Sequence, residues 1–217
     1  MPEILYQDAR VLAVSKPAGQ PVIPGRGDVG EPLFQELTRH LKTRLYVVHR
    51  IDRPASGVVV FAKDPETHRL LSGLFESHRV AKKYLALVAG IPPQDGTIDA
   101  RLRIYGSGRT AVDARGKPSL TRYKTIERYQ DSSLVEAFPE TGRRHQIRAH
   151  LFSISHPIAG DALYGDKRTA TLAPRLMLHA SEIHFKGLLF PPFQAPIPAD
   201  FQGILEGAKA GSLNRSR

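Results

Sequence analysis

Short apolar runs rich in β-branched residues, separated by Gly and Pro, dominate the hydrophobic pattern of the chain. Five of them stand out: VLAV at 11–14, GVVVFA at 57–62, YLALVA at 84–89, SLVEAF at 133–138 and EIHF at 182–185. Runs of this length and composition, bounded by turn residues, predict β-strands. We therefore expect a sheet to supply most of the core.

Two segments show helical spacing instead, with apolar residues sharing one helix face over 33–41 and over 70–75. The second has a start signal, because Asp64 suits the N-cap and Pro65 suits the first helical position. Strands outnumber helices and do not alternate regularly with them. The pattern predicts an α+β fold with a mainly antiparallel, mixed sheet flanked by helices and loops, rather than a doubly wound parallel sheet.

Gly and Pro cluster at 17–32 and 90–118, and we expect both stretches to be loops. The length of 217 residues allows one or two domains. The last segment, 206–217, ends in the small, polar and basic sequence GSLNRSR. It is predicted to be a disordered tail.

The amino-acid composition excludes several kinds of site. The 217 residues include no Cys, which excludes disulfides, thiolate zinc sites, iron–sulfur clusters and cysteine nucleophiles. The start of the chain lacks the pattern of a signal peptide, and no stretch approaches the ~18 apolar residues of a membrane span. We expect a soluble, cytoplasmic protein that does not bind a membrane.

Charge points to a polyanionic partner. Lys and Arg number 31 against 21 Asp and Glu, a net charge of +10. Such a surplus favours RNA or DNA, with acidic lipid as a weaker second choice. Residues 101–128 hold eight Lys or Arg against two acidic residues, a local balance of +6. A merely solvated face explains such a window equally well.

The segment YVVHRIDRPASGVVVFAKD at 46–64 places polar residues inside an apolar context. Asp52 lies between Arg50 and Arg53, and nearby guanidinium groups favour the ionised form of a carboxylate. The Asp is therefore a candidate nucleophile or base. A structural alternative stays open, in which Asp52 only ties down a loop through an Arg pair.

A second basic cluster, PETGRRHQIRAHLFSISHPIAGDALYGD, spans 139–166. A helix that starts at Thr141–Gly142 would present its amides, with Arg143, Arg144 and Arg148, to phosphates. Its two histidines are five residues apart, a poor spacing for shared metal ligation on a helix. The sequence also lacks phosphate-cradling and dinucleotide-binding loops, so we expect no metal and no nucleotide cofactor.

These residues carry a family resemblance. HRIDRPASGVVVFAK resembles the HRLDxxTSG signature of the RluA family of pseudouridine synthases, and TGRRHQIRAHL followed by HPIAGDALYG resembles its later block. Further segments agree in family order: ILYQD with VLAVSKPAG, KKYLALV and RLMLHASEIHF. The resemblance covers about residues 3 to 201. It implies the pseudouridine synthase catalytic fold, as a single domain over residues 1–205, in a short member without the N-terminal RNA-binding domain. Ile51 and Ala55 depart mildly from the signature.

The resemblance implies three catalytic residues: Asp52 as the catalytic carboxylate, Arg148 as its basic partner, and Tyr84 as the ring that packs on the target base. It also implies that Arg50 fills the place of a flipped nucleotide. Ile147 and Leu178 would be apolar walls around the base. Charge and nearness to the motifs, rather than the resemblance, make four further residues candidates for phosphate contact: Lys82, Lys83, Arg143 and Arg144.

The implied activity is isomerisation of specific uridines to pseudouridine in structured RNA, which is tRNA, large-subunit rRNA or both, by a monomer that needs no cofactor. The enzyme would flip the target base out of the RNA stack. A non-catalytic RNA-binding protein with the same fold is the alternative. A glycoside hydrolase would need two facing carboxylates, and the basic blocks offer only Asp52.

Overall fold

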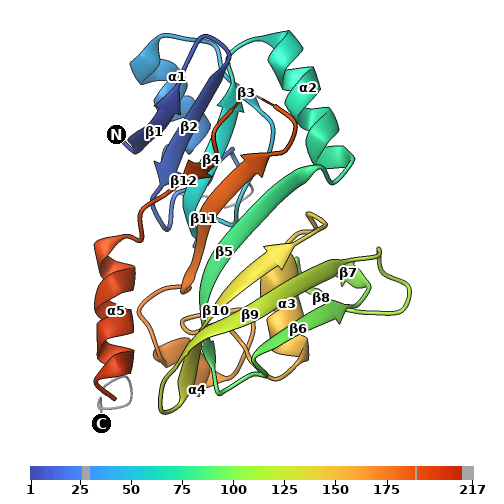
Figure 1. The fold of residues 1–217 in the computed structure, drawn as a ribbon, viewed down its shortest axis with the longest axis vertical. Coiled ribbons are helices and arrows are strands. Elements are labelled where there is room, and N and C mark those ends of the chain that lie inside the picture. The colour runs from blue at the N-terminus through green and yellow to red at the C-terminus, as the bar shows by residue number, and fades with distance from the viewer. Residues whose placement is uncertain (26–29, 189, 212–217) are drawn as a thin grey trace. The chain divides into compact units, whose positions relative to one another are not determined.

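The structure is a computed structural model that describes residues 1–25, 30–188 and 190–211 (Figure 1). The chain packs into two compact units. The first unit comprises Met1–Lys82 and Ala180–Pro196, and the second comprises Lys83–His179 and Ile197–Arg217. Strands β5 (Val80–Ala89) and β11 (Leu178–Phe185) contribute residues to both.

The first unit is a sheet with two helices. Its main strands follow the hydrogen-bonded order β1 (Glu3–Gln7), β2 (Val11–Lys16), β4 (Ser56–Ala62) and β11. Two short strands, β3 (Tyr46–Val47) and β12 (Phe193–Gln194), pair antiparallel with β4 and β11. The helices are α1 (Leu33–Leu41) and α2 (Pro65–Glu76).

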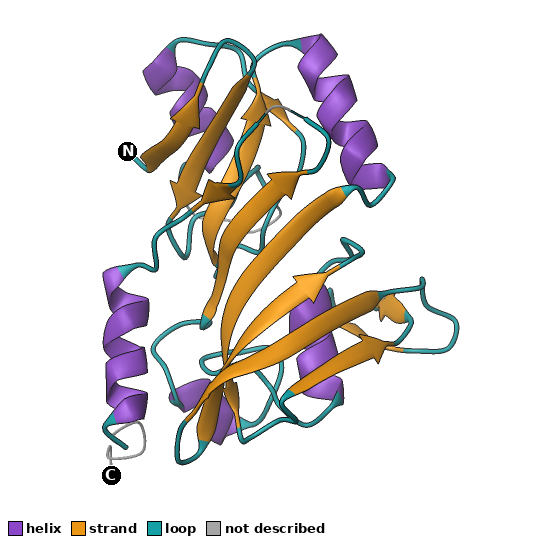
Figure 2. Ribbon diagram, in the orientation of Figure 1, coloured by secondary structure: helices purple, strands orange, loops and turns teal. Residues whose placement is uncertain are grey.

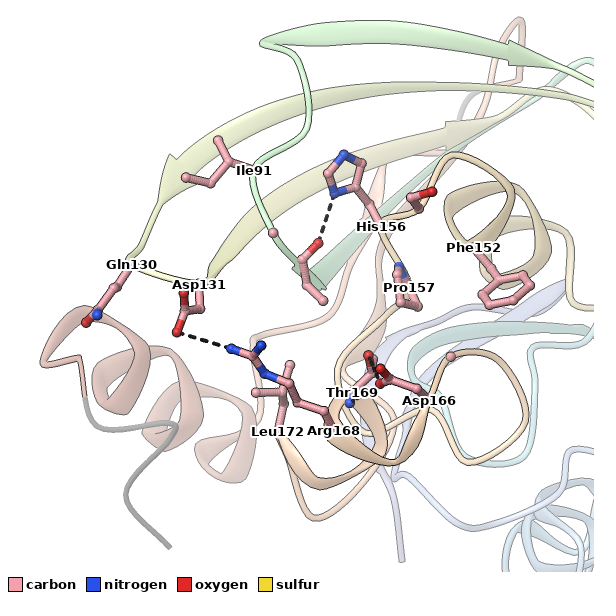
Figure 3. A pocket seen from close by; sticks show the side chains of 14 residues that line it. Ile91, Gln130, Asp131, Phe152, His156, Pro157, Asp166, Arg168, Thr169 and Leu172 are labelled. Carbon is pink, nitrogen blue, oxygen red and sulfur yellow. Dashed lines mark hydrogen bonds and ion pairs between the residues drawn. The ribbon is translucent and has the colours of Figure 1, made fainter. Parts of the chain in front are cut away.

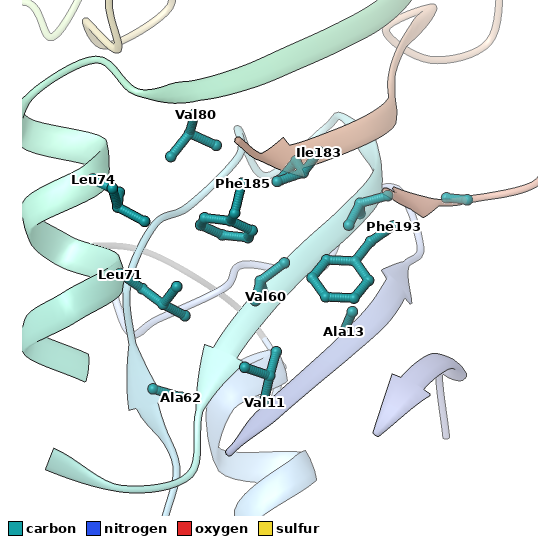
Figure 4. Close-up of a cluster of buried hydrophobic side chains, with 12 residues drawn as sticks. Val11, Ala13, Val60, Ala62, Leu71, Leu74, Val80, Ile183, Phe185 and Phe193 are labelled. Atoms are coloured by element: carbon teal, nitrogen blue, oxygen red, sulfur yellow. The ribbon is translucent and has the colours of Figure 1, made fainter. Parts of the chain in front are cut away.

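Helix α2 covers the apolar core of this sheet (Figure 4). Its Leu71 and Leu74 belong to one buried cluster with Val60 of β4 and Phe185 of β11. Every residue of β4 is buried, which explains why this strand reads as an unbroken apolar run. The Asp64 side chain accepts a hydrogen bond from the Thr67 amide at 2.8 Å and caps α2 as predicted.

The second unit contains its own antiparallel strands. Their order is β5, β10 (Ser132–Pro139), β9 (Leu120–Arg128) and β6 (Asp95–Asp99). A separate hairpin joins β7 (Leu102–Ile104) to β8 (Thr110–Val112). Figure 2 shows these strands with the helices α3 (Gln146–Ser153), α4 (Lys167–Thr171) and α5 (Ala199–Lys209).

The predicted fold class is confirmed. All five apolar runs lie in strands, and both predicted helices are present. Eight strand pairs are antiparallel: β1–β2, β2–β4, β3–β4, β11–β12, β5–β10, β9–β10, β6–β9 and β7–β8. The Gly- and Pro-rich segment 17–32 contains no strand or helix among its described residues, and 26–29 lie outside them.

The prediction of one loop over 90–118 is wrong, because this stretch contains β6, β7 and β8. Two of its glycines allow close packing, and Gly116 also closes a turn, in which its amide donates to the Asp113 carbonyl at 2.8 Å. A Cβ atom on Gly96 would lie 2.6 Å from the Tyr123 ring, and one on Gly116 would lie 2.5 Å from the Leu102 backbone. Both glycines allow close approach between neighbouring segments, which a sequence pattern does not distinguish from a turn.

The helix expected at Thr141–Gly142 begins later, at Gln146. The Gln146 side-chain oxygen accepts hydrogen bonds from the Arg143 amide at 3.0 Å and from the Thr141 hydroxyl at 2.6 Å. These bonds close residues 141–145 into a turn, and His145 adopts a left-handed conformation with φ of 53°. The prediction was wrong because side-chain bonds to the backbone compete with helix formation.

At the other end of the second unit, α5 continues to Lys209 and so includes the first four residues of the predicted tail. Residues 212–217 lie outside the described residues.

Candidate active site

Asp52 lies in the first unit, on a tight turn between β3 and β4. Its carbonyl accepts a hydrogen bond from the Ala55 amide at 3.1 Å. Ile51 and Ala55, on either side, are 7% and 1% exposed and anchor the turn in the core, whereas Asp52 itself is partly exposed. The fold therefore presents a carboxylate from a fixed backbone at the entry to a buried strand.

Lys16, at the end of β2, stabilises this turn through hydrogen bonds. Its side chain is buried, and the ammonium group donates hydrogen bonds to the carbonyls of Pro17 at 2.8 Å, Gln20 at 2.7 Å and Arg53 at 3.1 Å. The Arg53 carbonyl also accepts from the Gly19 amide at 2.9 Å. A buried ammonium is tolerated here because carbonyl oxygens replace its water. Lys16 lies in the SKPAG segment, whose role the sequence analysis left unassigned.

His49 supports the same region through a neutral ring. Its Nε2 atom accepts a hydrogen bond from the Val60 amide at 2.9 Å, and the ring stacks on Phe75 with centroids 4.8 Å apart. Burial, with a smaller contribution from the Lys82 charge, lowers the pKa of His49 to about 3. The histidine is thus an acceptor that braces β4 and carries no charge at neutral pH.

The predicted basic residues of β5 differ in environment. Burial lowers the pKa of Lys82 to about 8, so this ammonium loses its charge much closer to neutrality than an ordinary lysine. Lys83 lies 3.9 Å from the Glu136 carboxylate of β10. Tyr84 follows on the same strand, partly buried and opposite Ala137 of β10.

Arg148 lies in α3 of the second unit and forms a buried ion pair that the sequence analysis missed. Its Nε donates to Asp161 Oδ2 at 2.8 Å and its Nη2 donates to Oδ1 at 2.8 Å. The two side chains are 6% and 0% exposed. The sequence signal for this pair was Asp161, the acidic residue inside the mainly apolar segment HPIAGDALYG.

Tyr164 provides another contact of Arg148. The guanidinium carbon of Arg148 lies 5.0 Å from the centre of the Tyr164 ring, and that of Arg109 lies 5.1 Å from it. The phenol oxygen accepts a hydrogen bond from the Thr110 amide of β8 at 2.8 Å and lies 3.1 Å from His145 Nδ1. Burial is the main cause of the raised pKa of Tyr164, so the phenol stays protonated.

The remaining predicted residues of the second unit divide into buried and exposed groups. Ile147 and Leu178 are buried, as apolar walls would be. Arg143 donates weakly from Nε to the Pro118 carbonyl at 3.4 Å, and Arg144 is exposed beside the β7–β8 turn, with Nη2 3.5 Å from the position of a Cβ on Gly108. Of the predicted residues, the first unit holds Arg50, Asp52 and Lys82, and the second holds Lys83, Tyr84, Arg143, Arg144, Ile147, Arg148 and Leu178.

A cavity of 680 Å³ in the second unit contains none of these residues (Figure 3). Its polar lining groups bind one another: Arg168 lies 3.6 Å from the Asp131 carboxylate, and His156 Nδ1 lies 2.9 Å from the Ala89 carbonyl. The Asp166 carboxylate caps α4 through the Thr169 amide. This cavity therefore has none of the convergent chemistry seen around Arg148.

Within the described residues, no three His, Cys, Asp or Glu side chains form a group able to hold a metal ion. The same part of the chain contains no helix that is both long and apolar enough to cross a membrane.

Comparison with known proteins identifies the family of this chain. Residues 10–153 match the family model described as RNA pseudouridylate synthase. The chain therefore belongs to the RNA pseudouridylate synthase family, a family of isomerases.

Its relatives include enzymes named for both ribosomal and transfer RNA. The chain is 36% identical to ribosomal large subunit pseudouridine synthase D of Nitrosomonas europaea, over 95% of this chain and 65% of that protein, just under two thirds of its length. It is 37% identical to tRNA pseudouridine synthase C of Haemophilus ducreyi, over 84% of each. Among solved structures, human RNA pseudouridylate synthase domain containing 4 is similar, with a TM-score of 0.78 and 27% identity over 94% of this chain and 92% of that one.

Proposed function

We propose that this chain converts uridine to pseudouridine in structured RNA, with Asp52 as the catalytic carboxylate. The observation that carries the proposal is the position of Asp52 on a turn within the HRIDRPASG segment. A hydrogen bond from the Ala55 amide to the Asp52 carbonyl closes this turn, and Lys16 stabilises it by donating to the Arg53 carbonyl. A carboxylate held on a rigid backbone needs little reorganisation to meet a reacting atom. Membership of the pseudouridylate synthase family supports the same assignment.

The reaction exchanges one bond for another within a single nucleotide. The bond between ribose C1′ and base N1 breaks, the base turns, and a bond forms between C1′ and C5. The proton on C5 is then lost and N1 gains one, so atoms balance without an oxidant or reductant. Asp52 begins this sequence either as a nucleophile or by removing a ribose proton. Both routes require an ionised carboxylate.

In this proposal Arg148 is the basic partner of Asp52, as the family resemblance implies. A guanidinium has five N–H donors in one plane, and the Asp161 pair takes one from Nε and one from Nη2. A positive charge beside Asp52 favours the ionised carboxylate that the reaction requires.

The other assigned residues handle the substrate. Tyr84 packs on the target base and takes part in removal of the C5 proton. Arg50 fills the place of the flipped nucleotide, and Ile147 and Leu178 are apolar walls around the base. The phosphate backbone binds the four basic candidates: Lys82, Lys83, Arg143 and Arg144. Unstacking a base costs a few kcal/mol, which such contacts offset.

We propose a monomer acting in the cytoplasm on tRNA or large-subunit rRNA, the two substrates named for its relatives. The test is incubation of the purified protein with two RNA pools, total tRNA and deproteinised ribosomal RNA, each from cells that lack this protein. Carbodiimide-dependent reverse-transcription stops then map pseudouridine. New, site-specific stops in one pool are expected. RNA binding without new stops in either pool would overturn the proposal and favour the non-catalytic alternative.

A further inference from the structure

The basic window at 101–128 contains an arginine that the catalytic assignment does not use. We propose that Arg109, in the turn between β7 and β8, and Arg144, in the loop before α3, form a site that binds a phosphodiester of the RNA backbone. Both arginines lie in the second unit. The inference rests on the proposed function, because it names a place where the RNA backbone binds, and it adds Arg109 to the phosphate contacts.

Carboxylates already contact three other arginines of this window. Arg103 lies 3.4 Å and Arg115 lies 3.3 Å from the Asp113 carboxylate. Arg122 lies 2.9 Å from the Glu140 carboxylate. The positive charge that these three arginines offer to a polyanion is therefore reduced.

Arg109 differs from these three arginines. Within the described residues, no carboxylate lies at ion-pair distance from it, and its guanidinium donates no hydrogen bond to the protein. The guanidinium carbon lies instead over two aromatic rings, 5.2 Å from the centre of Phe152 and 5.1 Å from that of Tyr164. Stacking uses the flat face of a guanidinium and leaves its in-plane N–H donors for an anion.

The rings give the Arg109 side chain a fixed support. Tyr164 is 1% exposed, and its phenol oxygen accepts a hydrogen bond from the Thr110 amide at 2.8 Å. Phe152 lies in α3, with its ring centre 6.1 Å from that of Tyr164. Arg109 itself stays partly exposed. A side chain that is already held in place loses little conformational freedom when it binds a ligand.

Arg144 brings a second positive charge to the same turn. Gly108, the residue before Arg109, has φ of 79°, and Arg144 Nη2 lies 3.5 Å from the position of a Cβ atom there. The Arg144 side chain is exposed, and no carboxylate in the part of the chain that the structure describes pairs with it. Two arginines at one turn suit a phosphodiester, because guanidinium groups form charge-assisted hydrogen bonds with phosphate oxygens.

The salt dependence of RNA binding tests this site. Fluorescence anisotropy with labelled total tRNA gives the affinity at several KCl concentrations. Each phosphate that a cation neutralises contributes about 0.7–0.9 to the slope of log K against log salt, whatever the RNA sequence. Arg109→Gln should reduce this slope by about 1 and weaken the affinity several-fold, and Arg144→Gln should do the same.

Arg103→Gln is the matched control. Arg103 lies on the same hairpin, and its guanidinium carbon is 5.5 Å from the centre of the Tyr105 ring, but Asp113 pairs with it. This variant should leave the slope unchanged. An unchanged slope in Arg109→Gln would overturn the inference. An equal reduction in Arg103→Gln would also overturn it, because the surface charge as a whole would then explain the effect.

A free phosphate ion has the same chemistry as the proposed ligand, so a second probe separates the two. Suppose that Arg109→Gln keeps the tRNA slope but loses a rise in Tm that inorganic phosphate gives the unmodified protein. The site would then bind a small phosphate, and the inference would be overturned. Loss of the slope without any such rise in Tm supports the RNA backbone as the ligand.

A measurement on the unmodified protein covers the case in which Arg109→Gln does not fold. The Arg109 Nε–H resonance, assigned by its loss in Arg109→Lys, should shift when tRNA is added, and an unmoved resonance would overturn the inference. These binding measurements are independent of conversion. A chain that shows the expected slopes but forms no pseudouridine loses the proposed function alone, whereas an active enzyme with an unchanged Arg109→Gln slope loses only this site.

Discussion

Arg148 and Asp161 meet edge to edge, with both N···O distances 2.8 Å and both side chains buried. The arginine assigned to the catalytic acid is therefore already balanced by an acid thirteen residues further along the chain. This pairing makes Arg148 a stability residue as well as a functional one.

Replacing Arg148 by Met should therefore destabilise the protein, because it leaves the Asp161 carboxylate buried without its partner. Loss of one member of a buried pair costs about 3–5 kcal/mol, and urea unfolding measures it. Arg39→Met is the matched control, since its pair with Glu31 is exposed and worth about 1 kcal/mol or less. A loss below about 1 kcal/mol for Arg148→Met would show that the buried pair contributes little.

Lys16→Met should destabilise the turn that carries Asp52. The substitution keeps the apolar stem but leaves three carbonyl oxygens, those of Pro17, Gln20 and Arg53, without this donor. The Arg53 carbonyl keeps the Gly19 amide as a donor, so the acceptors left unsatisfied are those of Pro17 and Gln20. Each costs about 1–3 kcal/mol, so we expect a loss of ~2 kcal/mol or more in the free energy of unfolding.

The control for Lys16 is Lys63→Met, because the Lys63 ammonium binds one carbonyl, that of Asp8, at a partly exposed position. Its loss should be smaller. If both variants lost the same free energy of unfolding, Lys16 would not be a special stabilising residue of the Asp52 turn.

Lowering the pH should reduce the free energy of unfolding through protonation of His49. Its folded pKa of about 3 lies below the ordinary value of 6.5, so between these values the unfolded chain binds a proton that the folded chain does not. The free energy of unfolding therefore falls as pH falls through this window, by at most ~1.4 kcal/mol per pH unit.

The His49→Gln variant should flatten this slope when urea unfolding is followed at several pH values from 4 to 7. His150, whose pKa burial also lowers, adds a slope of the same sign and remains in the variant. The slope should therefore shrink without vanishing. An unchanged slope would show that His49 is not the buried neutral ring described here.

RNA affinity should depend on pH through Lys82. Because the pKa of its ammonium is about 8, the side chain loses most of its charge between pH 7 and pH 9. We expect the affinity for RNA to weaken several-fold over this range, and the weakening to disappear in Lys82→Arg, whose guanidinium stays charged. Fluorescence anisotropy at fixed ionic strength measures both, with Lys83→Arg as the control that should keep the pH dependence. A Lys82→Arg profile identical to that of the unmodified protein would contradict a phosphate contact at Lys82.

The sheet was predictable because its strands are buried apolar runs, of which β4 is the extreme case. The start of α2 was equally predictable, since Asp64 and Pro65 act locally. Strand β6 was not predictable, because Gly96 resembles a turn residue in sequence while it allows close packing against the Tyr123 ring.

For the candidate site, sequence identified the charged residues but not what holds them. The Asp52 turn is evident from its motif, yet the three carbonyls that bind Lys16 leave no trace in side-chain types. Asp161 lies thirteen residues beyond Arg148 and outside α3, so only the tertiary fold brings the two side chains together.

The central claim is that Asp52 carries the chemistry, and pseudouridine formation by Asp52→Asn tests it most directly. The variant keeps the shape of the side chain but cannot act as a nucleophile or base, so conversion of a competent RNA should fall by a factor on the order of 10³ or more, with RNA affinity nearly unchanged. Asp64→Asn, at the N-cap of α2 in the same unit, should convert the RNA at the unmodified rate. Turnover by Asp52→Asn within tenfold of the unmodified enzyme would contradict the account.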